Sequence, residues 1–181
     1  MLKLPRTIRL DPSDTLVFER AAEPGEWAVP GAFMFSHQDV QSLEGKQRAA
    51  FRSGFVGIET LGWSTLAQVV EAADADRVRA IEILARQLVA HFGAPDLMAA
   101  KAAAEEEIAF AASLSDHPNG MLVALSRQHD NGSIRETFRT LTPAVGLAPA
   151  RAYAFLEVAG EEEEATDQID LRTLGKEATG G

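Results

Sequence analysis

Four histidines are the first residues of this sequence whose chemistry would suit catalysis or metal binding. They are widely separated, and no two have the i, i+4 spacing that places two ligands on one helical face. Two of them flank one expected strand and therefore lie at its opposite ends. We expect the turn histidines His117 and His129 to be solvated loop residues. We expect no catalytic or metal site from this set, which comprises His37, His91, His117 and His129.

Three consecutive glutamates, Glu105 to Glu107, form the densest acidic group within an expected helix. Successive helical residues point about 100° apart, so these side chains cannot all face one site. Carboxylate-bridged metal centres in helical bundles place a histidine three residues after a glutamate. The residues at that offset are Ile108, Ala109 and Phe110, and we therefore predict a solvated helix face.

A serine motif and the glycine pattern give no catalytic or cofactor signature. The stretch Gly62-Trp63-Ser64-Thr65-Leu66 begins like a G-x-S-x-G nucleophile elbow, but Leu66 replaces the second glycine. Glycine-rich phosphate loops and dinucleotide fingerprints are absent from the sequence. The absence of cysteine excludes disulfides, thiolate nucleophiles and zinc–thiolate sites. We therefore predict no catalytic residue, cofactor or metal.

Two pairs of arginines are the candidates for contact with an anion or a partner. Arg48 and Arg52 belong with Lys46 to the only local basic cluster, and Arg135 and Arg139 share one face of an expected strand. A guanidinium group binds carboxylate or phosphate through two parallel hydrogen bonds. The same arginines could equally neutralise nearby acids, because the chain has a net charge of −10.

The charge of the chain limits its expected partners. Residues 151–181 contain eight acidic and three basic residues, which places half of the net charge of −10 there. Such a chain repels phosphate backbones and anionic lipid surfaces, so neither nucleic acid nor membrane is an expected partner. Another protein is the expected partner, and homo-oligomerisation stays open.

Length and hydropathy favour one domain. A chain of 181 residues with 46% hydrophobic residues can bury a sizeable core. We predict one domain over residues 1–160 and an acidic, flexible tail over residues 161–181. The expected location is cytoplasmic, because the first residues lack the apolar segment of a signal peptide and no apolar run reaches the ~18 residues of a membrane helix.

Residues 74–116, which the rest of the chain must accommodate, predict two amphipathic helices. Asp74 and Asp76 suit the start of the first helix, Gly93 ends it, and Asp96 opens a second that runs to about Ser113. Their short connection predicts an antiparallel hairpin. The first helix should dock on the core through one apolar stripe, formed by Val78, Ile81, Leu84, Ala85, Leu88, Val89 and Phe92. The second should pack more thinly and present an acidic outer face.

Most of the remaining chain has strand-like patterns. Residues 6–10 and 15–20 predict a hairpin, residues 26–35 an interrupted edge strand, and residues 55–60 and 63–71 two further strands. A short helix is expected over residues 43–52. Asn131-Gly132 predicts a tight turn between strands at 121–128 and 133–141, and residues 151–159 predict a last, central strand. The fold class is therefore α+β, with a mostly antiparallel sheet of about six to eight strands and the helical hairpin packed on one face.

Several stretches resemble an uncharacterised family of alphaproteobacterial proteins, classified as a domain of unknown function. They are residues 14–20, residues 24–29, residues 61–66 and residues 109–112. The resemblance covers about residues 5 to 142. It implies a bacterial cytoplasmic setting, and it implies no activity, cofactor or catalytic residue.

These observations lead to three functional hypotheses. The first is a non-catalytic accessory or protein-interaction module. The second is an enzyme or small-anion-binding protein with a pocket lined by Arg48, Arg52, Arg135 or Arg139. The third is a carrier protein, because the C-terminal Gly180-Gly181 resembles the end of ubiquitin-like sulfur carriers.

Overall fold

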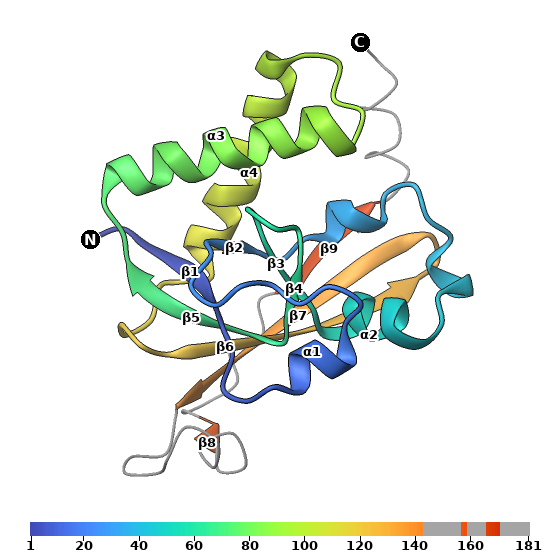
Figure 1. Ribbon diagram of the computed structural model, residues 1–181, viewed down its shortest axis with the longest axis horizontal. Helices are drawn as coiled ribbons and strands as arrows, with labels where there is room; N and C mark the ends of the chain where they lie inside the picture. Colours follow the sequence, from blue (N-terminus) through green and yellow to red (C-terminus); the bar gives the residue numbers. More distant parts are fainter. Residues whose placement is uncertain (143–156, 159–165, 171–181) are drawn as a thin grey trace.

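The computed structural model describes residues 1–142, 157–158 and 166–170, and Figure 1 shows their arrangement. The described helices are α1 (Ser13–Val17), α2 (Gly45–Ser53), α3 (Asp74–His91) and α4 (Leu97–Ser113), with short 3₁₀ turns η1 (Ala32–Phe35) and η2 (Val40–Ser42). Gly93 adopts the expected left-handed conformation after α3, and the Asp96 side chain accepts a hydrogen bond from the Ala99 amide at 2.8 Å. The predicted end of the first helix and the predicted start of the second are therefore confirmed.

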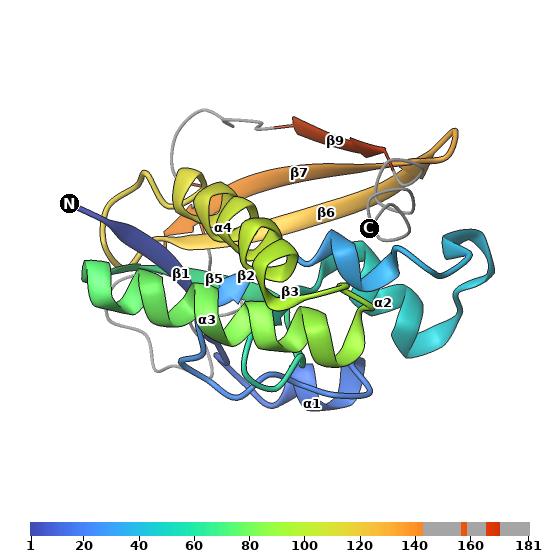
Figure 2. The same ribbon diagram turned by 90° about the horizontal axis from the view of Figure 1, so that it is seen from above.

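The described strands form two antiparallel sheets, which confirms the α+β class. In the larger sheet the order is β1 (Lys3–Ile8), β5 (Leu66–Glu71), β6 (Leu122–Asp130), β7 (Ser133–Thr142) and β8 (Glu157–Val158), with β9 (Thr166–Asp170) also paired to β7. The smaller sheet contains β2 (Ala28–Val29), β3 (Phe55–Gly57) and β4 (Trp63–Ser64). Figure 2 shows α3 and α4 covering these strands on one side.

The β6–β7 hairpin has the predicted turn. Asn131 and Gly132 both have positive φ, at 48° and 85°, and Asp130 pairs directly with Ser133. A two-residue turn of this kind matches the twist of the flanking strands and fixes their register. Arg127 is thereby placed directly opposite Glu136.

The predicted hairpin between residues 6–10 and 15–20 is wrong. β1 pairs with β5 instead, and Ser13–Val17 form α1. The Asp11 carboxylate accepts a hydrogen bond from the Ser13 amide at 2.7 Å, which stabilises the first turn of the helix. A sequence of Asp, Pro and Ser suits a type I turn and a helix start equally well, because both use the same local backbone bonds.

Residues 26–35 form only a short strand before the chain turns. β2 lies at the edge of the smaller sheet, as expected, and Gly31 has a φ of 83° where the chain enters η1. A β-carbon at Gly31 would collide with the Val56 side chain, so the close approach also requires glycine. η1 consequently carries its aromatic side chains inward.

The second helix packs more closely than the sequence indicated. α4 contacts both β1 and β2, because its inward residues are mostly alanines that allow the backbones to approach. Those buried residues are Ala100, Ala104, Ile108 and Ala111. The expectation that the second helix would pack more thinly than the first is therefore wrong at these contacts.

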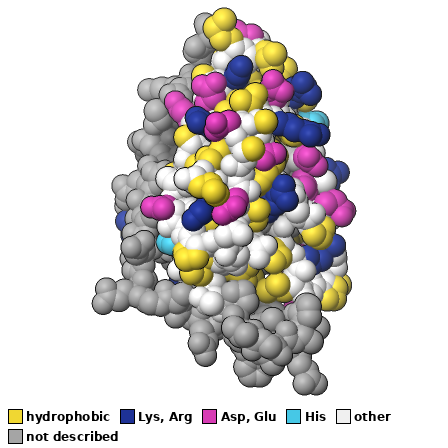
Figure 3. Space-filling model, turned by 90° about the vertical axis from the view of Figure 1, so that its left-hand side faces the viewer, with side chains coloured by type: hydrophobic (Ala, Val, Ile, Leu, Met, Phe, Trp, Pro, Cys, Tyr) yellow, Lys and Arg dark blue, Asp and Glu magenta, His cyan; other side chains and the backbone are white. Residues whose placement is uncertain are grey.

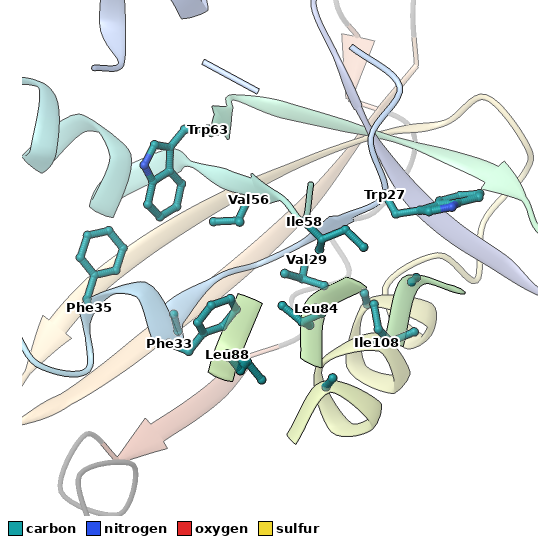
Figure 4. Packing of buried hydrophobic residues seen from close by; sticks show 14 of the residues in the cluster. Trp27, Val29, Phe33, Phe35, Val56, Ile58, Trp63, Leu84, Leu88 and Ile108 are labelled. Atoms are coloured by element: carbon teal, nitrogen blue, oxygen red, sulfur yellow. The ribbon is translucent and has the colours of Figure 1, made fainter. Parts of the chain in front are cut away.

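The buried stripe of α3 is also narrower than predicted. Val78 and Val89 remain 54% and 42% exposed, because α4 and the strands cover a smaller arc of the helix than the apolar pattern spans. Leu84, Leu88 and Ile108 are buried, and Figure 4 shows Leu84 next to Val29 and Leu88 next to Phe33. Trp27 and Trp63 are buried as well.

Two predictions fall mostly outside the described residues. The strand expected over residues 151–159 is described only at Glu157–Val158, which pair with β7. The tail of residues 161–181 is described only at Thr166–Asp170, which also pair with β7. Among the helices that the structure describes, none combines the length and apolarity needed to cross a bilayer.

Leu84→Ala should lower the free energy of unfolding by about 2–5 kcal/mol, because it opens a cavity at a fully buried site. Val89→Ala on the same helix is the control and should change it by less than about 1 kcal/mol, since Val89 is partly exposed. Urea unfolding followed by circular dichroism measures both. Equal losses for the two variants would contradict this description of α3.

Candidate functional site

The four arginines predicted from sequence lie on two separate elements. Arg48 and Arg52 are exposed on α2, and Arg139 is exposed on β7. Arg135, also on β7, is partly exposed and forms an ion pair with Asp130 at 3.5 Å. None of the four borders the cavities described below.

The other chemically suggestive residues have structural or solvated positions. The Ser64 hydroxyl is buried and lies 2.6 Å from the Leu66 carbonyl oxygen and 3.1 Å from that of Ile8. Within the described residues, no three histidine or acidic side chains are arranged to hold a metal ion. Gly180 and Gly181, on which the carrier hypothesis depends, lie outside the described residues.

Sequence reasoning missed the central polar group, which is the buried pair of Arg127 and Glu136. Both side chains are fully buried, and the Glu136 Oε2 atom accepts hydrogen bonds from Nε and Nη2 of Arg127 at 3.2 and 3.1 Å. Strand alternation and the predicted turn at Asn131-Gly132 could together have identified this pair from the sequence. They place Arg127 in line with the apolar Val123 and Leu125 on the covered face of the sheet.

The guanidinium group of Arg127 also binds backbone carbonyls from the chain around the smaller sheet. Its Nη1 atom donates to the carbonyls of Phe51, at 2.7 Å, and Ala50, at 3.3 Å. Its Nη2 atom donates to those of Pro30 and Gly54. Because these donors are directed at protein groups in a closed interior, we assign the pair a structural rather than a catalytic role.

Burial lowers the pKa of the Arg127 guanidinium, because a charged group loses its hydration in the interior. The negative charges of Glu136 and Glu107 oppose this change. Arginine nevertheless stays protonated, since its ordinary pKa is far above neutrality. A permanent charge is therefore held where the larger sheet meets α2 and the end of β2.

A second buried carboxylate, that of Glu26, organises the loop after β3. It accepts hydrogen bonds from the amides of Glu23, Glu59 and Thr60 at 2.7–2.9 Å, and from the Thr60 hydroxyl at 2.7 Å. A β-carbon at Gly57 would lie 2.7 Å from the Glu26 carboxyl carbon. The carboxylate thus links the loop at Glu23 to the loop at Glu59 and Thr60. Both of its oxygens already accept hydrogen bonds from protein donors.

An open, mostly apolar cavity of about 350 Å³ lies where the α3–α4 connection meets η1. We call it the tip groove. Phe33 and Leu88 form its buried part, and the ring of Phe92 packs edge-to-face on Phe33 with centroids 5.2 Å apart. The α4 side is formed by the buried Ala100 and by the exposed Ala99, Ala102, Ala103 and Glu106.

The residues from α4 leave the tip groove open. The exposed Ala99, Ala102, Ala103 and Glu106 are spaced by three and four residues, which places them on one helical face. The side chains of these three alanines are too small to fill the space in front of them. Exposed hydrophobic residues flank the same hairpin tip: Met98 at 82%, Leu97 at 59% and Val89 at 42%. Large apolar side chains gathered on a surface mark interaction sites more often than single exposed residues do.

Arg127→Met should lower the free energy of unfolding by about 3–5 kcal/mol, because it removes the cation beside a buried carboxylate. Arg135→Met, the control on the next strand, should change it by less than about 1 kcal/mol, since its ion pair is partly exposed. Combining Arg127→Met with Glu136→Leu should not restore full stability, because the four carbonyls still lose their donor. Chemical denaturation distinguishes these outcomes, and a fully stable double variant would contradict the role given to the carbonyls.

Comparison with known proteins places the chain in a family. The family model described as "Family of unknown function (DUF6505)" matches residues 1–154. No curated protein and no solved structure shows significant similarity to the chain. Because the matched region covers well over half of the 181 residues, the chain belongs to this family of unknown function.

Proposed function

We propose that the protein is a non-catalytic interaction module that binds a partner protein through the tip groove. One observation carries this proposal: the α3–α4 connection that lines this open apolar cavity of about 350 Å³ is flanked in the chain by the exposed Val89, Leu97 and Met98. Exposing such a surface is unfavourable in water, and a partner that covers it gains the corresponding hydrophobic free energy. The resemblance to a bacterial family supports placing this interaction in the bacterial cytoplasm.

The polar groups at the tip groove favour binding over catalysis. They are Ser36, His37 and Glu106, which belong to three different positions around the cavity. Within the described residues, no hydrogen bond joins one of these side chains to another. An activated nucleophile needs a base within hydrogen-bonding distance, and that base needs a third group to orient it. These three side chains are better suited to fixing the orientation of a bound segment.

The chemistry of the tip groove favours an amphipathic helix with basic residues as the bound segment. A helix presents apolar side chains at spacings of three and four, which can fill an elongated apolar groove between two helices and a turn. The exposed carboxylate of Glu106 borders the tip groove and can pair with a lysine or arginine of the partner. The net charge of −10 further favours a basic partner.

A labelled helical peptide with leucines at i, i+3, i+4 and i+7 and lysines on the opposite face provides a direct probe. Ala103→Trp fills the tip groove and should weaken peptide binding about tenfold or more, and Glu106→Lys should weaken it through charge repulsion. Fluorescence anisotropy titration measures both effects. The same variants, used as bait in parallel captures from cell lysate, identify proteins that need the tip groove.

The matched controls lie on the same helix outside the tip groove. Ala109→Trp and Glu105→Lys alter exposed residues that do not line it, and both should bind like the original protein. Circular dichroism confirms that each variant retains its fold. If Ala103→Trp and Ala109→Trp bind the peptide equally well, the tip groove is not the binding surface.

A further inference from the structure

A second surface lies on the outer side of α3, where the partly buried Ile83 also packs against the core. Ala75, Val78, Arg79, Glu82, Ile83 and Arg86 line a shallow depression of about 520 Å³, which we call the α3 stripe. Val78 is 54% exposed, so the stripe contains an apolar side chain that the core does not cover. Figure 3 views the side of the molecule on which α3 begins and shows hydrophobic side chains interspersed with basic and acidic ones.

The charged residues of the α3 stripe have no partners within the described part of the chain. Arg79, Glu82 and Arg86 are exposed, and the described ion pairs and side-chain hydrogen bonds involve none of them. Glu82 has an arginine three residues before it and another four residues after it, at helical spacings that permit pairing. Both arginines are instead available to an external carboxylate.

The α3 stripe is complementary to itself when two copies of α3 run antiparallel. A two-fold axis between positions 80 and 81 places Val78 of one copy opposite Ile83 of the other. The same axis places Arg79 opposite Glu82, and each such pair occurs twice by symmetry. Arg86 then faces Ala75 of the other copy, next to the acidic Asp74. At the centre of the pair, apolar residues therefore meet apolar residues and opposite charges meet.

Other alignments of two α3 helices lack this match. Sliding one antiparallel helix by one turn toward its N-terminal end places Arg79 opposite Arg86. A parallel pair places each stripe residue opposite its own copy, so that Arg79 meets Arg79 and Glu82 meets Glu82. Like charges held opposite one another disfavour both arrangements.

We propose that the protein self-associates through the α3 stripe as an antiparallel, two-fold symmetric pair. The occupant of this surface is therefore a second copy of the chain, selected by the Val78–Ile83 and Arg79–Glu82 complementarity. The stripe shares no lining residue with the tip groove, so self-association stands independently of the proposed function. A failure of one proposal leaves the other intact.

Charge reversal on the full chain tests the pairing. Glu82→Arg leaves arginine at positions 79, 82 and 86, and Arg79→Glu leaves two facing glutamates. Each single change should weaken self-association about tenfold or more. The double variant carrying both changes should associate like the original protein, because its Arg–Glu pairs are only exchanged. An equimolar mixture of the two single variants should form mixed dimers for the same reason.

Sedimentation velocity across a micromolar-to-millimolar concentration series measures each association constant. Arg77→Glu is the matched control, since it makes the same charge change as Arg79→Glu at an exposed position of α3 outside the stripe. It should associate like the original protein. Restored association in the double variant cannot arise from a misfolded single variant, so it supports the pairing specifically.

Three results would overturn the proposal. The first is that the original protein remains monomeric throughout the series. The second is that the single charge reversals associate as strongly as the original protein. The third is that the double variant does not recover association. Binding of an unrelated protein to the α3 stripe, without association between copies, would also replace the second copy as its occupant.

Discussion

The buried charge of Arg127 is the constraint around which the rest of the structure is arranged. A guanidinium group removed from water is strongly unfavourable unless its donors are satisfied, and here Glu136 and four backbone carbonyls accept from it. Those carbonyls belong to residues 30, 50, 51 and 54, whereas Arg127 itself belongs to the larger sheet. The arginine therefore joins the two sheets and α2 through directional bonds, which hydrophobic packing alone would not provide. The rings of Phe35 and Phe51 lie 5.6 and 5.9 Å from its guanidinium carbon and complete the enclosure.

This constraint extends to the tip groove through a short stretch of chain. Pro30, whose carbonyl Arg127 binds, is followed by Gly31 and then by η1. η1 contributes Phe33 to the tip groove, where it packs against Phe92 at the end of α3. The apolar surface is thus supported from behind by a fixed polar network and from the side by a helix held in the core through Leu84. Such support allows an exposed groove to keep its shape without a ligand.

Features set by neighbouring residues were predictable, whereas features set by packing were not. The end of the first helix of the hairpin, the start of the second and the Asn131-Gly132 turn were predicted correctly, because capping and positive φ depend on residues close in sequence. The segment around Asp11 was misjudged because turns and helix starts share local chemistry, and only the pairing of β1 with β5 decides between them. Arg127 was missed because a charged residue is assumed to be exposed. The tip groove could not be foreseen, since it exists only where η1 and two helices meet.

The alanines of α4 form two sets, and the structure limits the size of the side chain differently in each. Ala104 and Ala111 face inward, where a larger side chain would push the helix away from β1 and β2. Ala99, Ala102 and Ala103 face the tip groove, where a larger side chain meets only open space and costs the fold little. Among homologous chains, the residues at the first set of positions should therefore remain small, whereas those at the second set should vary in size. A family built in this way can change the shape and polarity of the tip groove by single substitutions without rebuilding its core.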